Sequence, residues 1–403
     1  MKNYIRKSIF VAILVLVALS GFPGVRFPET GATFHQSGNQ NPQFEQIASG
    51  IEHLQFTRGH KSEQPTTGPW LINLLRVDPD LAQLEFARAL DAGVGLETTS
   101  SMAMRYGAIA AINGGYFRTT GVYRGESVGI YQLRGKLISE THNDRAAAGL
   151  VGNGDRNKVV LGHLGFSGEI RTSKSRLRVN GINRPRAQDE LIIFTPEFHR
   201  STLTIPDGIE VSVQRDRATS IRDSKGSTLI PADGYVISAA GTARHWVLEN
   251  VQRGTKLTLS LTLIPIDKTQ EKEWRRAHSI VGGGPQLISG GRIGITNAQE
   301  KILPAFVTDL HPRTAFAKLA SGKLLLMTVD GRQPGRSIGM SLNMLADLLL
   351  EFGAVEAINL DGGGSTTMVI HNKVVNSPSD QNGERPVSDA ILIFAKLAHD
   401  QNP

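Results

Sequence analysis

Hydrophobic positions in this chain fall into short runs, and most runs end in a turn rich in glycine or polar residues. Short continuous or alternating apolar runs predict β-strands. Such runs occur at 70–77, 84–90, 108–112, 191–194, 209–213, 235–238, 257–263, 324–329 and 355–360. Helical periodicity is rare. It is clear only over 342–352, between the capping residue Ser341 and Gly353, with a shorter candidate over 97–106. The pattern predicts one α+β domain with a mixed, mostly β core, a few helices and glycine-rich loops.

Changes in composition divide the chain into regions. Residues 21–65 are rich in Gly, Gln, Asn, Ser, Thr and Pro without sustained periodicity, which predicts a flexible linker. Residues 66–397 form the predicted domain. Within it, the β-rich stretch at about 155–275 reads as an excursion from the main sheet.

The first 20 residues read as a targeting segment. Lys2, Arg6 and Lys7 precede an apolar run over residues 9–19, followed by small residues typical of a cleavage site. The alternative is an uncleaved N-terminal membrane anchor over residues 8–25. Either interpretation predicts a secreted or cell-envelope protein.

Charge and cysteine content exclude several classes of function. A net charge of +7 points weakly to anionic partners, but no arginine-rich stripe is interleaved with aromatic residues, so no nucleic-acid partner is expected. The absence of Cys excludes disulfides, zinc–thiolate sites and a thiol nucleophile. No cofactor is expected. Whether carboxylates on the glycine loops hold a hard cation stays open.

The sharpest motif is Asp361-Gly362-Gly363-Gly364-Ser365-Thr366, directly after the apolar run at 355–360. Successive glycines let a ligand approach the backbone, whose free N–H groups can cradle an anion. No Lys follows the glycines, so the motif is not a Walker loop. The alternative is a tight turn in which the aspartate makes a local hydrogen bond.

A second loop, Asn113-Gly114-Gly115, follows the run at 108–112 and is similar to the segment from Asn359 to Gly363. This similarity predicts two loops that face one site, although Asn113 in a plain left-handed turn is the alternative.

Three further segments carry candidate charges. Asp330 and Arg332 share one loop, Arg313 and Thr314 precede a strand, and Glu384 and Arg385 lie in the polar loop 376–389. Arginine forks suit phosphate, whereas the alternative is an ordinary surface ion pair or a structural arginine. Asn113, Asp330 and Asp361 each follow an apolar run, so we expect them to converge as strand ends along a common sheet edge.

Five segments taken together carry a family resemblance. They are Asn113–Phe117, Gly282–Pro285, His311–Ala315, Asp330–Arg332 and Asn359–Thr366, in that order. The chain resembles the phosphodiester glycosidase family over roughly residues 68–397. The resemblance implies Asp361, Asp330 and Asn113 as catalytic residues. It implies substrate-binding roles for Gly114, Gly115, Arg313, Thr314, Arg332, Asn359, Gly362, Gly363, Gly364, Ser365, Thr366, Glu384 and Arg385.

The implied reaction is hydrolysis of a sugar-1-phosphodiester, or of a phosphorylated glycan, to a free sugar and a phosphomonoester. A carboxylate would act as base or nucleophile at C1, while arginines hold the phosphate. Two alternatives remain: a non-catalytic wall-glycan-binding module, and a phosphodiesterase that cuts the P–O bond.

Overall fold

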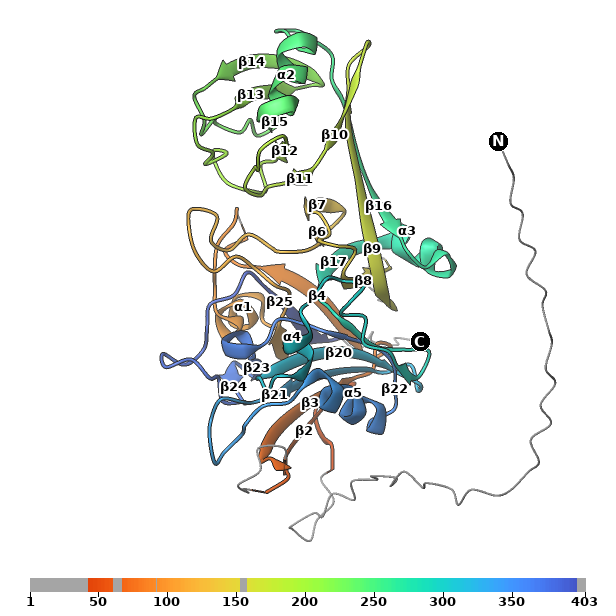
Figure 1. Cartoon of the computed structure of the whole chain (residues 1–403). Coiled ribbons are helices and arrows are strands. Elements are labelled where there is room, and N and C mark those ends of the chain that lie inside the picture. The colour runs from red at the N-terminus through yellow and green to blue at the C-terminus, as the bar shows by residue number, and fades with distance from the viewer. Residues whose placement is uncertain (1–42, 61–66, 92, 153–157, 397–403) are drawn as a thin grey trace, which may run out of the picture. The chain divides into compact units, whose positions relative to one another are not determined.

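The computed structural model describes residues 43–60, 67–91, 93–152 and 158–396. The predicted N-terminal targeting segment lies outside these ranges. Within them the chain is built mainly from antiparallel strands with a few short helices (Figure 1). The predicted α+β class with a mostly β core is therefore confirmed. No helix in the described part is long and apolar enough to cross a membrane.

The largest sheet has eight strands and carries the predicted site strands β21 and β22. Its order is β1 (Glu45–Ala48), β2 (Ile51–Arg58), β3 (Trp70–Val77), β21 (Leu324–Val329), β20 (Arg313–Leu319), β22 (Ala354–Asn359), β18 (Gln286–Ser289) and β19 (Arg292–Ile293). One face is covered by α5 (Leu342–Glu351) and α4 (Pro304–Thr308), whose apolar residues pack against the strands. Ser341 caps α5 by accepting from Met344 N at 3.2 Å, as predicted.

A five-stranded sheet packs against the other face of this sheet through a shared hydrophobic cluster. It comprises β24 (Lys373–Val374), β23 (Met368–Ile370), β5 (Ala110–Asn113), β25 (Asp389–Ala395) and β4 (Ala82–Arg88), with α1 (Thr99–Tyr106) beside it. Asn113 therefore ends a strand of one sheet, whereas Asp330 and Asp361 follow strands of the other. The expected single sheet edge is wrong: two packed sheets bring the loops together.

The β-rich excursion has two parts. Long strands extend a seven-stranded sheet away from the other two sheets (Figure 1). This sheet contains β10 (Arg176–Val179), β9 (Lys158–Arg171), β8 (Ala146–Val151), β17 (Ala277–Gly282), β6 (Tyr131–Leu133) and β7 (Lys136–Ser139), with β16 (Thr258–Pro265) paired to β9. The 3-10 turn η2 (Lys268–Gln270) and α3 (Glu271–Arg276) join β16 to β17.

The second part of the excursion is a small sheet, whose hydrophobic cluster also includes residues of β9, β10 and β16. Its order is β11 (Gly181–Ile182), β12 (Leu191–Phe194), β15 (Gly234–Ala239), β13 (Ile209–Gln214) and β14 (Arg217–Asp223), and α2 (Gly241–Asn250) packs on it.

The predicted linker is too long. Residues 45–58, assigned to it from composition, form β1 and β2, and β2 pairs with β3 along its whole length. Ile51 and Leu54 are buried, while polar side chains between them keep partial exposure. Those polar residues on an edge hairpin hid the strand signal.

Candidate active site

The two glycine loops meet directly. Asn113 donates from Nδ2 to the carbonyl oxygen of Asp361 at 2.6 Å, and Asp361 N donates to Gly114 O at 3.1 Å. Asn113 Oδ1 accepts from Thr314 Oγ1 at 2.9 Å and from Thr367 N at 3.1 Å. The amide of Asn113 is fully buried and both its ends are engaged. Its geometry suits holding the Asp361 loop in place.

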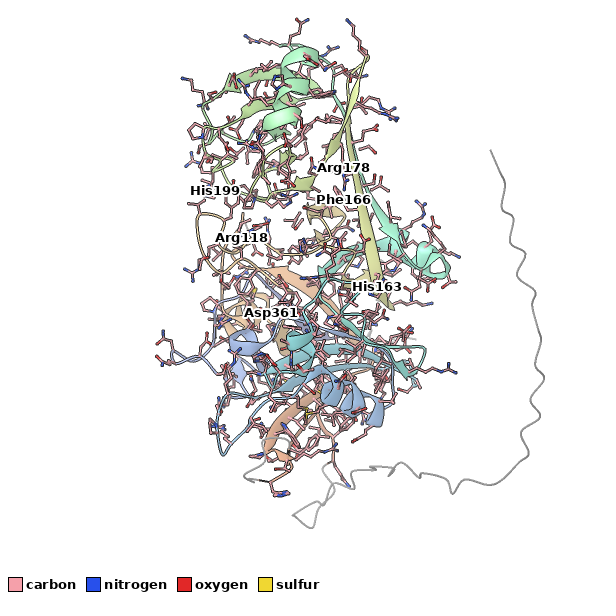
Figure 2. The ribbon with its side chains drawn as sticks, viewed as in Figure 1. Arg118, His163, Phe166, Arg178, His199 and Asp361 are labelled. Atoms are coloured by element: carbon pink, nitrogen blue, oxygen red, sulfur yellow. The ribbon has the colours of Figure 1, made fainter. Side chains whose placement is uncertain are left out.

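Asp361 is a half-buried residue at the start of the triple-glycine loop, just after the end of β22 (Figure 2). Burial raises the pKa of Asp361 to about 6, against the opposing effects of the Ser365 hydroxyl and the Gly362 N–H. Gly362 N donates to Oδ1 at 2.9 Å. The group is therefore mainly ionised at neutral pH and more basic than an ordinary aspartate, as a base or nucleophile requires.

The glycines after Asp361 allow charged side chains to press against the loop. Gly363 has φ +61°, and a Cβ there would lie 3.1 Å from Nη2 of Arg332. A Cβ on Gly364 would collide with the ion pair between Asp380 and Arg385. Glycine is required at both positions, because the loop backbone lies directly beneath guanidinium groups. The turn η3 (Gly363–Ser365) forms here.

Arg332 is the exposed arginine of the site. Its Nη2 lies 3.4 Å from Nδ1 of His311, and no carboxylate pairs with it in the part of the chain that the structure describes. Burial, with the charges of Arg313 and Arg332, lowers the pKa of His311, so that His311 is neutral at pH 7. The Arg332 fork thus remains available to an oxyanion beside Gly363.

Arg313 is buried, with 1% exposure, and points into backbone carbonyls. It donates to Met340 O at 2.9 Å and to Phe306 O and Asp309 O at 2.8 Å each. Burial lowers the pKa of Arg313 to about 10, so the group stays charged at neutral pH. Arg313 is a cation without a carboxylate partner among the described residues, and it adds positive potential behind the site.

Tyr116 links the loops to the Gly282–Pro285 segment. Its hydroxyl donates to Gly284 O at 2.7 Å and accepts from Asn359 Nδ2 at 2.7 Å. Burial is the main cause that raises the pKa of Tyr116, and the negative charge of Asp361 raises it further. The phenol is therefore a neutral donor. Asn359 Oδ1 is buried without a partner within the described residues, an unused acceptor in this cluster.

Arg145 was missed by the sequence reasoning. Its guanidinium carbon lies 5.9 Å from the centre of the Tyr116 ring, and its Nε is buried without a partner among the described residues. The one signal in the sequence is a charged residue directly before the small, buried strand β8. Arg145 supplies another cation near the phenol that borders Asp361.

Comparisons with known proteins found a matching family model and several similar sequences. Residues 207–394 match the family model "Phosphodiester glycosidase". A bovine N-acetylglucosamine-1-phosphodiester alpha-N-acetylglucosaminidase is 43% identical over 75 residues, 19% of this chain and 14% of the relative. The mouse protein of the same name is 29% identical over 174 residues, 40% of this chain and 32% of the relative. These matches support the resemblance of the chain to the phosphodiester glycosidase family.

The chain spans at most about a third of the length of these two relatives. The match to the family model also covers the site only in part. The family model includes the Asp361 loop but stops short of Asn113, Tyr116 and Arg145. A crystal structure of a protein from Burkholderia pseudomallei shares the fold, with a TM-score of 0.77 over 90% of this chain and 97% of that one, at 22% identity.

Asp330, the second carboxylate expected in the candidate site, is buried, and both of its carboxylate oxygens accept hydrogen bonds. Oδ1 accepts from Asn376 Nδ2 at 2.9 Å and Oδ2 from Ser377 N at 2.8 Å. Asn376 Nδ2 also donates to Thr366 O at 3.0 Å. Asp330 therefore joins the glycine loop through Asn376. Burial raises the pKa of Asp330.

The two residues expected from the loop 376–389 have partners of their own. Glu384 accepts from Ser100 N at 2.8 Å, at the first turn of α1. Arg385 donates to both oxygens of Asp380, at 2.7 and 2.9 Å, and this pair lies against Gly364. Arg385 thus borders the glycine loop, whereas Glu384 is directed to the helix.

Asp389 is a buried carboxylate that the motif reasoning passed over. Its Oδ1 accepts from Gly115 N at 2.8 Å and its Oδ2 from Ser388 Oγ at 2.5 Å. Burial raises the pKa of Asp389. No group of three or more His, Asp or Glu side chains in the described ranges has the geometry of a metal site.

Proposed function

We propose that this phosphodiester glycosidase hydrolyses a sugar-1-phosphodiester to a free sugar and a phosphomonoester. One observation carries the proposal. Asp361, a half-buried residue whose pKa is raised to about 6 by burial, opens a glycine loop that packs beneath the guanidinium of Arg332, which has no carboxylate partner among the described residues. The name of the curated relatives supports the same chemistry for the substrate class.

In the proposed reaction, the bond between C1 and the phosphate oxygen breaks. Asp361 either takes the proton of a water that attacks C1 or attacks C1 itself, giving a glycosyl ester that water then hydrolyses. The phosphomonoester leaves as an anion, so the site needs little acid assistance. Arg332 binds the departing charge directly, and Arg313 and Arg145 add positive potential.

Asn113 and Asp330 act in this proposal as positioning residues. Asn113 holds the carbonyl of Asp361, and Asp330 holds Asn376 beneath the loop. Each fixes the loop backbone, and misplacement of a base by a fraction of an ångström is costly to catalysis.

The test is incubation of the full chain with a panel of sugar-1-phosphodiesters, reading released sugar. Asp361→Asn should lower turnover by about a hundredfold or more, the scale of losing a general base. Asp347→Asn, the same change at an exposed position of α5, is the matched control and should keep full activity. Full activity of Asp361→Asn on a substrate that the wild type cleaves would end the proposal. Retention of glycans without turnover would favour the binding-module alternative.

We further propose that the protein acts outside the cytoplasm, on a cell-envelope or extracellular glycan. The basic start and apolar run of residues 2–19 support this. Fractionation of cells that express the full chain should place it in the envelope or the medium, and recovery solely from the cytosol would contradict the proposal.

A further inference from the structure

A polar pocket lies between the loops around β6 and β7 and the start of the small excursion sheet. Its volume is about 580 Å³, within the usual range of ligand sites. Its lining includes Glu126, Glu140, Arg178 and Arg184, and Phe166 of β9 contributes an aromatic ring. None of the residues predicted from the glycine motifs lines it.

Glu126 is a buried, half-satisfied carboxyl group of this pocket, with 4% exposure. Its Oε2 accepts from Arg118 Nε at 2.9 Å, and its Oε1 has no hydrogen-bond partner in the described ranges. Burial raises the pKa of Glu126 to about 7, against the pull of Arg118. Near neutral pH this group can therefore donate as well as accept a hydrogen bond.

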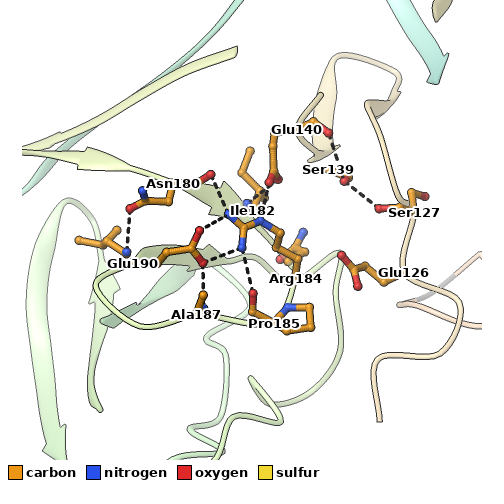
Figure 3. A network of polar contacts seen from close by, with 12 residues as sticks. Glu126, Ser127, Ser139, Glu140, Asn180, Ile182, Arg184, Pro185, Ala187 and Glu190 are labelled. Atoms are coloured by element: carbon orange, nitrogen blue, oxygen red, sulfur yellow. Dashed lines mark hydrogen bonds and ion pairs between the residues drawn. The ribbon is translucent and has the colours of Figure 1, made fainter. Parts of the chain in front are cut away.

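Glu140 and Arg184 form a fixed network at the same pocket (Figure 3). Glu140 accepts from Arg184 Nε at 2.6 Å and from Ile182 N at 2.8 Å. Arg184 also donates from Nη1 and Nη2 to the two oxygens of Glu190, at 2.8 and 2.9 Å. Two carboxylates thus hold one guanidinium in place, and this wall is formed before any ligand arrives.

Carboxylates and guanidinium groups both line the pocket, and this mixture of charges favours a neutral ligand. A free phosphate would face the carboxylates of Glu126 and Glu140, and a cation would face Arg118 and Arg178. Hydroxyl groups both donate and accept, so a neutral polyol can satisfy carboxylates and guanidinium groups together. The Phe166 ring offers an apolar surface for the C–H face of a sugar. We propose that this pocket binds neutral sugar residues of a glycan.

The pocket is connected with the candidate active site through one loop. Residues 127–129 line it, and Val128 N donates to Tyr116 O at 2.7 Å. The Tyr116 hydroxyl in turn bonds Asn359 and Gly284. If the proposed hydrolysis holds, the pocket takes the sugar chain that extends from the scissile phosphodiester. The binding itself does not depend on that reaction.

The test measures binding without turnover. Maltotetraose, chitotetraose and mannotetraose are titrated into the full chain by calorimetry and saturation-transfer NMR, with inorganic phosphate as competitor. At least one oligosaccharide should bind. Glu126→Gln should weaken it about tenfold, the scale of one lost hydrogen bond to a charged group. Independently, Phe166→Ala should weaken it about tenfold, because the sugar loses its apolar contact with the ring. Phosphate should not displace it.

Glu271→Gln is the matched control, because Glu271 forms an exposed pair with Arg275 on α3 and does not line the pocket. It should bind like the wild type, and thermal unfolding checks that all variants are folded. The proposal is overturned if no oligosaccharide binds, if both pocket variants bind unchanged, or if phosphate competes. Binding with no hydrolysis of any phosphodiester would sink the proposed reaction alone.

Discussion

Replacing Asp361 by asparagine should stabilise the protein while it lowers turnover by about a hundredfold or more. Burial raises the pKa of Asp361 from 3.8 to about 6, so the folded state binds this proton more tightly than the unfolded chain. The stability that the protonated group contributes is complete below pH 3.8 and is lost as the pH rises through about 6. At 1.36 kcal/mol per pKa unit, the ionised carboxylate costs about 3 kcal/mol at pH 8 and less than about 1 kcal/mol at pH 4.

Asparagine escapes this cost because it does not ionise, and its Oδ1 can still accept from Gly362 N. In urea denaturation, Asp361→Asn should exceed the wild type in free energy of unfolding by about 3 kcal/mol at pH 8. The gap should nearly close at pH 4. The exposed control Asp347→Asn should show no such trend. A variant that is less stable than the wild type at pH 8, or a gap that does not change with pH, would refute the reasoning.

Three further outcomes follow from the site. Arg332→Lys should lower kcat/KM by roughly ten- to a hundredfold in steady-state assays, because lysine has no bidentate fork. The thermal unfolding temperature should stay unchanged, because Arg332 is exposed. Unchanged kinetics would exclude a bidentate contact between Arg332 and the phosphate. Gly364→Ala should lower the free energy of unfolding by about 1–3 kcal/mol in urea titrations, since the new Cβ displaces the Asp380–Arg385 pair; unchanged stability would show that the loop yields freely. The kcat/KM of the wild type should rise with pH and level off above about 6, as Asp361 ionises; a fall across this range would assign the essential group a protonated role.

Much of this site could be predicted because its chemistry sits directly after regular strands. The apolar run before Asp361 forms β22, and the run before Asn113 forms β5. The similarity of the two loops predicted that they face one site, and the hydrogen bond from Asn113 to the Asp361 carbonyl brings the two loops into contact. Local patterns of this kind survive folding because the strand, the turn and the exposed carboxylate all depend on neighbouring residues.

The remaining features depend on contacts between distant segments. Arg145 and Asp389 have no motif around them, and only the packing of separate sheets places Arg145 near Tyr116 and Asp389 against Gly115. The roles of Glu384 and Asp330 depend on partners 284 and 46 residues away. An ionisable residue in a polar loop looks the same in sequence whether it meets substrate or another part of the chain.

Hydrolysis in water enriched in oxygen-18 tests the central claim most directly. The wild type is incubated with a sugar-1-phosphodiester that it cleaves, and the mass of each product is measured by mass spectrometry. If Asp361 directs attack at C1, the heavy oxygen appears in the sugar and the phosphomonoester carries none. Label in the phosphomonoester, with none in the sugar, would show P–O cleavage and contradict the account.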